Sequence, residues 1–135
     1  MGRACHKFNN PELWKVGNCV LLFYISAMTR FIHPNLNDVP LASMLHALSD
    51  PTRLEIVRKL DADATATGEG LACNCAAPEG LPRATISNHF TILRSAGLIE
   101  ARKEGTKVIH RLRRPEVDAR FPGLLDAVLR AETAP

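Results

Sequence analysis

The 135-residue sequence predicts a mainly helical domain of the α+β class, with about five helices and one two-stranded β-hairpin. Two observations predict this class. Apolar residues recur at helical spacing in several segments, and two segments that alternate in polarity flank a glycine-containing turn near residue 105. A hydrophobic fraction of 46% with 23% charged residues is typical of a globular chain, and 135 residues are enough for one core.

The most clearly bounded helix spans residues 82–97. Pro82 suits the first turn, because the N–H that proline lacks would have no helical partner there. Gly97 suits the position just past the helix end, where φ becomes positive. One apolar stripe at helical spacing consists of Ile86, Phe90, Ile92 and Leu93.

The opposite face of this helix is polar and cationic, and residues 81–98 contain no carboxylate. That face consists of Arg83, Thr85, Ser87, Asn88, Thr91 and Arg94. A surface helix ordinarily mixes both signs of charge, whereas a helix without acid suits a polyanion. Short hydroxyl and amide side chains also fit base edges in the major groove of DNA. We therefore interpret this element as a DNA-recognition helix.

Segments 98–103 and 107–113 alternate in polarity on either side of a turn that contains Gly105, which predicts a β-hairpin. The basic side chains near its tip and along its return strand are Arg102, Lys103, Lys107, Arg111, Arg113 and Arg114. A helix, a glycine and a basic hairpin in this order indicate a winged helix-turn-helix. In that fold the helix enters the groove and the wing reaches phosphates.

Charge is distributed unevenly along the chain. The net charge is only +3, but residues 81–114 hold eight Lys or Arg against two Glu. Such a concentration is the electrostatic footprint expected of a nucleic-acid-binding surface. The alternative is an ordinary solvated basic face, which the coincidence of charge with the order of the motifs disfavours.

Two further helices are predicted before the recognition helix. Asp38 is expected to cap the first, whose buried stripe should consist of Leu41, Met44, Leu45 and Leu48. Asp50 and Pro51 are expected to be the N-cap and first residue of the second. Residues 61–70 are small and polar and predict a surface loop, and residues 71–77 should form one or two turns of the first helix of the helix-turn-helix.

Pro115 opens a C-terminal segment whose apolar residues are Val117, Phe121, Leu124, Leu125, Val128 and Leu129. A chain of this length is unlikely to bury both this face and the stripe over residues 41–48 within one monomer. We therefore expect a C2 homodimer, since large apolar faces left in water mark interfaces.

Residues 1–37 are interpreted as an N-terminal extension, and residues 38–135 as the DNA-binding and dimerisation domain. Residues 1–27 differ in character from the rest, so Met28 is an alternative start; the other interpretation is an extra helix over residues 11–28 that packs on a dimer partner. No apolar stretch approaches the roughly 20 residues that span a bilayer. The four cysteines suggest no disulfide framework and no signal peptide is evident, so a cytoplasmic protein without a membrane partner is expected.

Several segments together resemble the ArsR/SmtB family of winged-helix repressors. Residues 47–54 (ALSDPTRL) are similar to its signature at the second helix, and residues 86–90 (ISNHF) and 93–99 (LRSAGLI) to its recognition helix and exit turn. The resemblance implies a homodimer that binds a palindromic operator in double-stranded DNA and leaves it when an inducer binds. The DNA-reading positions that it implies are Arg83, Thr85, Ser87, Asn88 and His89.

Cys73 and Cys75 lie near the position of a Cys-x-Cys pair in metalloid-sensing members of that family. Two thiolates two residues apart can bind one soft ion such as As(III) or Zn(II) if the helix frays locally, with Cys5 or Cys19 of a partner as a third ligand. Thiol oxidation, an unrelated organic inducer, and a merely structural pair of small residues are the alternatives. The C-terminal segment contains no histidine, so the family's interhelical zinc site is doubtful.

Other classes of protein find less support in the sequence. No Ser, His and Asp are spaced as a triad and no glycine-rich phosphate loop occurs, so we expect no enzyme and no cofactor beyond an inducing ion. A winged helix used only for protein contacts remains the second interpretation, and titration against random duplex DNA at low salt would separate the two.

Overall fold

The computed structural model describes residues 31 and 33–131. The chain divides into two units, Met1–Phe31 and Ile32–Pro135, and every element described below belongs to the second. The predictions that concern Met28, Cys5 and Cys19 lie outside the described residues.

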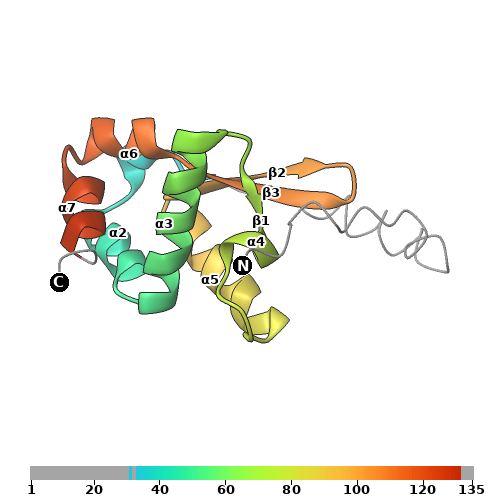
Figure 1. Ribbon diagram of the computed structural model, residues 1–135. Coiled ribbons are helices and arrows are strands. Elements are labelled where there is room, and N and C mark those ends of the chain that lie inside the picture. Colours follow the sequence, from blue (N-terminus) through green and yellow to red (C-terminus); the bar gives the residue numbers. More distant parts are fainter. Residues whose placement is uncertain (1–30, 32, 132–135) are drawn as a thin grey trace, which may run out of the picture. The chain divides into compact units, whose positions relative to one another are not determined.

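Six α-helices and three strands make up the described part of the second unit (Figure 1). The helices are α2 (Leu41–Leu48), α3 (Pro51–Ala66), α4 (Cys73–Ala76), α5 (Arg83–Ser95), α6 (Arg114–Arg120) and α7 (Leu124–Ala131), after a 3-10 helix η1 (Leu36–Asp38). The strands are β1 (Leu71–Ala72), β2 (Ile99–Glu104) and β3 (Lys107–Leu112). They form one antiparallel sheet in the order β1-β3-β2. The mainly helical fold with a hairpin wing is confirmed, with one more helix and one more strand than predicted.

One apolar core joins the helices to the sheet, and α3 runs through the middle of the domain (Figure 1). Its largest fully buried apolar side chains are Met44, Ile56, Leu60, Phe90, Leu93, Leu98, Ile99 and Leu125. The predicted stripe of α5 is confirmed, because Phe90 and Leu93 are buried while Ile86 and Ile92 pack against the core. This packing fixes α5 on one side and leaves its other side in solvent. None of the described helices is long and apolar enough to cross a membrane.

Gly97 ends α5 as predicted, with φ at +78°. A Cβ at this position would lie 2.6 Å from Cδ2 of Leu36, which is closer than real Cβ contacts. Glycine is therefore required both for the left-handed backbone and for the close approach of η1. The chain then enters β2 directly, which sets the wing against the recognition helix.

A polar corner joins α2 to α3. Asp50 caps α3 as predicted, since its Oδ1 accepts a hydrogen bond from the Arg53 N–H at 3.0 Å. The Arg53 side chain is 7% exposed and turns back toward α2. Its Nε donates to the Ala47 carbonyl at 2.7 Å and its Nη2 to the His46 carbonyl at 3.0 Å. The His46 carbonyl also accepts hydrogen bonds from the N–H and the hydroxyl of Ser49, which follows α2. Asp50 and Arg53 therefore reinforce the ends of two helices at once.

Replacing Arg53 with methionine should lower the free energy of unfolding by about 2 kcal/mol, because buried carbonyls lose a charged donor. Urea denaturation of Arg53→Met and wild type measures the difference. The matched control is Arg83→Met, since Arg83 is exposed and its loss should change stability little. Equal stability of Arg53→Met and wild type would mean that the hydrogen bonds of the Arg53 side chain contribute nothing to the free energy of unfolding.

Three predictions for the first half of the domain are wrong. Residues 61–70 do not form a loop throughout, because α3 continues to Ala66 and ends where the N–H groups of Thr67 and Gly68 both bond the Asp63 carbonyl. Asp38 does not cap α2; it lies in η1, and the N-cap position belongs to Pro40 without a side-chain bond. The segment predicted as helix over residues 71–77 begins instead with β1, which pairs with β3, and the helix that follows is the single turn α4.

The stripe predicted for α2 is only half buried. Met44 and Leu48 are in the core, whereas Leu41 is 47% exposed and Leu45 46% exposed. These two leucines are four residues apart and so lie on one face of the helix. The domain therefore presents an apolar pair to solvent, and that pair has no counterpart among the other described large hydrophobic residues.

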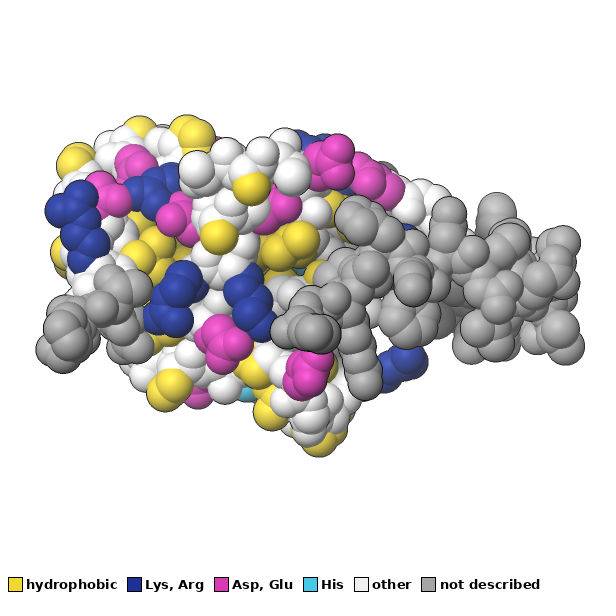
Figure 2. Space-filling model, in the orientation of Figure 1, with side chains coloured by type: hydrophobic (Ala, Val, Ile, Leu, Met, Phe, Trp, Pro, Cys, Tyr) yellow, Lys and Arg dark blue, Asp and Glu magenta, His cyan; other side chains and the backbone are white. Residues whose placement is uncertain are grey.

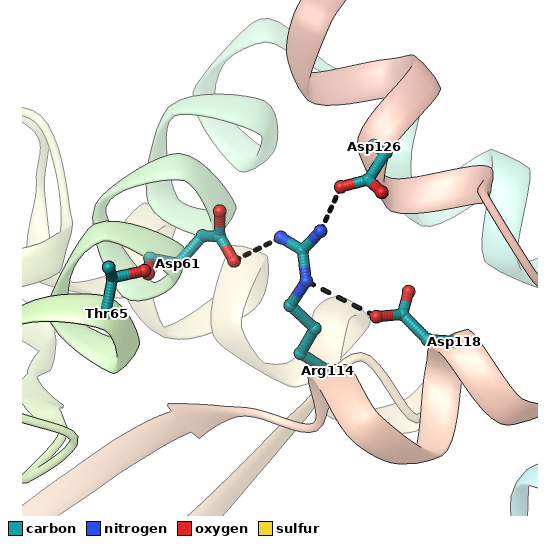
Figure 3. Close-up of polar contacts among 5 residues, drawn as sticks. All are labelled: Asp61, Thr65, Arg114, Asp118 and Asp126. Atoms are coloured by element: carbon teal, nitrogen blue, oxygen red, sulfur yellow. Dashed lines mark hydrogen bonds and ion pairs between the residues drawn. The ribbon is translucent and has the colours of Figure 1, made fainter.

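Arg114 connects three helices through carboxylates (Figure 3). Its Nη1 pairs with Asp61 of α3 at 2.5 Å and its Nε with Asp118 of α6 at 3.4 Å, and its Nη2 pairs with Asp126 of α7. The hydrogen bonds to Asp61 and Asp126 raise the pKa of Arg114, so it stays charged. This node holds the C-terminal helices against the last turns of α3.

Candidate nucleic-acid interface

The start of α5 is open to solvent and has no acidic residue in its first turn. Pro82 occupies the N-cap position with extended backbone angles and makes no side-chain cap bond. The first N–H groups of a helix point away from it without helical partners, and the helix dipole adds positive charge at this end. The N-terminal end of α5 therefore favours the binding of a phosphate group.

The exposed face of α5 consists of polar side chains of the recognition motif: Arg83, Thr85, Ser87, Asn88 and Thr91. The Thr91 hydroxyl donates to the Ser87 carbonyl at 2.9 Å, which fixes its rotamer along the helix. Asn88 and Ser87 keep their donors and acceptors directed at solvent, as base readout requires. The five predicted positions thus lie together on one accessible surface.

The structure turns two other predicted residues of α5 inward. The His89 side chain is 13% exposed, and its Nδ1 lies 4.0 Å from Oδ1 of Asp50 at the start of α3. Arg94 lies close enough to Cys73 and His110 for its charge to lower the pKa values of both. Both residues turn inward because they flank the buried apolar stripe of the helix. Direct contact of His89 and Arg94 with DNA stays a prediction.

The wing is formed by β2 and β3, whose register pairs Glu104 with Lys107 around the turn at Gly105. Lys103 is exposed and Lys107 half-buried, and neither makes an ion pair within the part of the chain that the structure describes. Arg102 instead pairs with Glu104 and donates to the Glu69 carbonyl at 3.2 Å. Of the three predicted wing residues, the two lysines are therefore the cations without an ion pair among the described residues.

The two arginines that follow β3, Arg113 and Arg114, are less available to phosphates than the sequence suggested. Arg113 donates to the Pro34 carbonyl at 2.9 Å and pairs with Glu116, and Arg114 belongs to the carboxylate node described above. Their charges are largely neutralised by neighbours. Figure 2 shows that basic and acidic side chains are intermixed over the face of the domain that it draws. The helix α5, by contrast, contains no acidic residue.

Cys73 and Cys75 both lie in α4, directly before the turn that leads to α5. Cys73 Sγ lies 3.0 Å from Nε2 of His110 in β3. His110 is 1% exposed, and the centre of its ring lies 4.4 Å from that of Phe90 in α5, with the two ring planes tilted by 46°. Among the described residues no group of three His, Cys, Asp or Glu side chains converges as metal ligands. Binding of a metal by Cys73 with Cys75 stays a prediction.

Sequence reasoning missed the partnership of Cys73 with His110. The alternation of β3 placed His110 on the same strand face as Leu112, and therefore toward the core. The position of α4 against that face depends on β1, which pairs Leu71 with His110. A two-residue strand gives no sequence signal, so the contact could not be found from the pattern alone.

Burial shifts the ionisation of both groups in this contact toward their neutral forms. It raises the pKa of the Cys73 thiol and lowers the pKa of His110 to about 4, with the charge of Arg94 lowering the latter further. At neutral pH the contact is therefore between a thiol and an uncharged imidazole.

Comparison with known proteins agrees with this geometry. A helix-turn-helix domain model matches residues 48–102, which run from the end of α2 into the wing. The uncharacterized HTH-type transcriptional regulator MJ1325 of Methanocaldococcus jannaschii is 42% identical over 67 residues, covering 48% of this chain and 68% of that protein. The HTH-type transcriptional regulator CmtR of Mycobacterium tuberculosis is 33% identical over 98 residues, covering 73% of this chain and 79% of CmtR.

The fold is also found in a solved structure. The crystal structure of an ArsR family transcriptional regulator superposes with a TM-score of 0.51 at 20% identity, covering 70% of this chain and 93% of that one. The sequence relatives, the matched helix-turn-helix region and this shared fold agree with the exposed recognition helix and its wing. The chain therefore belongs to the family of HTH-type transcriptional regulators with a helix-turn-helix DNA-binding domain, and it shares its winged-helix fold with an ArsR family regulator.

Proposed function

We propose that this regulator is a homodimeric repressor that binds a palindromic operator in double-stranded DNA and leaves it when an inducer binds. The observation that carries the proposal is the acid-free, exposed face of α5 beside a wing that carries Lys103 and Lys107. A repressor of this kind acts on DNA in the cytoplasm.

Within this proposal some residues contact the bases and others contact the phosphates. Asn88 and Ser87 read base edges, since an asparagine side chain can bond adenine in a bidentate manner. Arg83, Thr85 and the open end of α5 hold phosphates at the groove edge, and Thr91 extends the reading face. Lys103 and Lys107 contact the backbone from the wing, and Arg102 contributes there if its pairing with Glu104 opens.

Replacing Asn88 with alanine should reduce discrimination between operator and random duplex by ~1–3 kcal/mol, since one base contact is lost. Lys107→Ala should instead weaken binding to all sequences and reduce the slope of log affinity against log salt by about one unit. Fluorescence anisotropy over a series of salt concentrations measures both quantities.

The matched control for charge is Arg120→Ala, because Arg120 is an exposed residue of α6, outside α5 and the wing. It should bind as wild type does. An Asn88→Ala variant with unchanged sequence preference would contradict the assignment of α5 as the reading helix. If wild type failed to bind even random duplex at low salt, the second interpretation, a winged helix for protein contacts, would replace the proposal.

A homodimer is supported by the exposed leucine pair on α2. The helix α2, which carries Leu41 and Leu45, lies at the end of the domain away from the tip of the wing, as does α7 (Figure 1). On α7, Leu125 and Leu129 are buried, while Leu124 and Val128 pack at the edge of the core. A two-fold contact through α2 would cover the leucines and place two recognition helices about one helical turn, ~34–36 Å, apart.

The proposed inducer acts through α4, the single turn between α3 and the recognition helix. Cys73 is a free thiol and Cys75 is disulfide-bonded, so this inducer requires the reduced protein. There a soft metal or metalloid bound at Cys73 and Cys75 would tighten this turn and tilt the start of α5. Oxidation of a thiol or an organic inducer are the alternative triggers. Operator release measured with As(III), Cd(II), Zn(II) and peroxide, on wild type and on Cys73→Ser/Cys75→Ser, tests them: an unchanged response of the double variant would exclude the cysteines as sensor.

A further inference from the structure

The side chain of His89 lies in the middle of the recognition helix α5, between the exposed Asn88 and the buried Phe90. It is 13% exposed, and its Nδ1 is buried without a hydrogen-bond partner among the described residues. A buried polar atom without a partner costs free energy, because it has lost water and gained no other hydrogen bond. A group that can reach Nδ1 would therefore stabilise this side chain.

The carboxylate of Asp50, the N-cap of α3, faces this nitrogen. Its Oδ1 lies 4.0 Å from Nδ1 of His89, which is too long for a hydrogen bond. A movement of about 1 Å would bring the two atoms to bonding distance. The same Oδ1 accepts the Arg53 N–H at 3.0 Å, so the carboxylate is held on α3. The imidazole, with the helix that carries it, is therefore the group that has to approach.

Asp50 carries a negative charge without a strong cation beside it. Its side chain is 33% exposed and forms no ion pair with Lys or Arg of the described ranges, because the Arg53 guanidinium bonds carbonyls of α2 instead. Burial by itself would raise the pKa of Asp50, but the hydrogen bond from the Arg53 N–H and the charges of Arg53 and His89 hold it below its ordinary value. The carboxylate is therefore ionised at neutral pH.

We propose that His89 is a positioning residue for operator recognition, whose imidazolium pairs with Asp50 and ties α5 to the N-cap of α3. Both ring nitrogens of an imidazolium carry protons, so protonation places an N–H on Nδ1 and a positive charge beside the carboxylate. Asn88 precedes His89 on α5, so the pair sets how this reading residue meets a base edge. The inference rests on the proposed function and adds that operator binding takes up a proton.

The electrostatic field of DNA favours the charged form of His89. Phosphates attract a nearby cation, and they are repelled by Asp50 unless its charge is neutralised. An imidazole in water takes up a proton at about pH 6.5, which lies within the range of ordinary binding assays. Operator affinity should therefore rise as the pH falls from 8 to 6, since binding and protonation support each other.

The ionisable groups of the elements packed against α5 define the controls. From α3, Arg53 is the cation whose charge acts on Asp50. From α2, His46 lines a groove beside the C-terminal half of α5, and α4 has its two cysteines as its only ionisable side chains. The remaining charged side chains on α5 and on β2, which follows it, are Arg83, Arg94, Glu100, Arg102, Lys103 and Glu104. Of all these groups His46 alone titrates near neutral pH as His89 does, so it is the control histidine.

The first test measures the affinity of the wild-type chain at pH 8 and pH 6 by fluorescence anisotropy. One probe is a duplex that wild type has selected from a random pool, and the other is random duplex. We expect the selected duplex to bind about fivefold more tightly at pH 6 and the random duplex to gain less, because a positioned helix improves base readout. An equal gain for both duplexes, or no gain, would overturn the proposal.

Proton uptake is measured on the same wild-type chain, so this readout needs no variant to fold. Calorimetry of binding to the selected duplex in two buffers of different ionisation enthalpy should show net uptake of protons. Release of protons, or no exchange, would overturn the proposal.

The second test repeats the affinity measurements with Asp50→Asn, His89→Gln and the double variant. Asparagine caps a helix as well as aspartate does, so Asp50→Asn removes the charge and keeps the cap. Each single variant should lose the gain at pH 6, and the double variant should lose no more than either. A gain that persists in Asp50→Asn would mean that His89 acts on DNA directly, and would overturn the pairing.

His46→Gln is the matched control and should keep the gain of wild type. Loss of the gain in His46→Gln would assign the proton to α2 and overturn the proposal. Circular dichroism at both pH values verifies the fold of each variant. A wild type that binds no duplex at either pH would instead contradict the proposed function, whereas binding without pH dependence would contradict the pairing alone.

Discussion

Replacing Leu41 and Leu45 with lysine is expected to leave the domain folded, to make it monomeric and to weaken operator binding by about 10²- to 10⁴-fold. The leucines are nearly half exposed already, so lysine costs the monomer little. A dimer contact would bury them, and two charges there would oppose association. The loss of affinity follows because two linked recognition helices bind far more tightly than one.

Light scattering at micromolar concentration and anisotropy with a palindromic duplex measure the two effects. The matched control is Ala62→Lys/Ala66→Lys, which adds the same charges four residues apart on the exposed side of α3. It should remain dimeric. If wild type is itself a monomer that binds a single half-site with full affinity, the dimer model is wrong.

Acidification of the metal-free protein is expected to remove about 3 kcal/mol of stability between pH 6.5 and 4 through His110 alone. Burial lowers the pKa of His110 from 6.5 to about 4, so over this interval the unfolded chain binds a proton that the folded chain excludes. The contribution is therefore present above pH 6.5 and is lost as the pH falls. About 2 kcal/mol of the loss should appear by pH 5.

Urea denaturation at pH 7 and pH 5, with a chelator present, measures this difference for wild type and His110→Gln. The variant lacks the titrating imidazole and should lose much less stability. His46→Gln removes an exposed histidine and serves as control, with a pH dependence like that of wild type. The same dependence in His110→Gln as in wild type would show that other groups cause it.

Elements with strong local signals were predicted well from the sequence. The recognition helix has a proline at one end, a required glycine at the other and a clean apolar stripe, and its bounds differ from prediction by one or two residues. The alternation of β2 and β3 and the Asp50 cap are likewise local and are confirmed. The pattern of polar residues along α5 predicted a DNA-reading face, and five of its positions are exposed, whereas His89 and Arg94 turn inward.

Features that depend on distant partners could not be predicted. The last turns of α3 carry no apolar stripe, so the sequence predicted a loop there. In the fold Asp61 forms an ion pair with Arg114, which lies far along the chain. β1 exists through its pairing with β3. The inward turn of His89 toward Asp50 and the hydrogen bond of Arg102 to the Glu69 carbonyl likewise require the packed fold.

The division of α5 into two faces has a consequence for how such a regulator changes in evolution. One face consists of exposed polar residues, Ser87, Asn88 and Thr91. The other consists of buried residues, Phe90 and Leu93, which hold the helix against the core. Substitutions that alter operator preference are therefore nearly neutral for folding, while substitutions in the buried stripe are not. A gene duplicate could diverge to a new operator by a few changes on one face, and the same positions are those to randomise when the protein is re-targeted as a genetic switch.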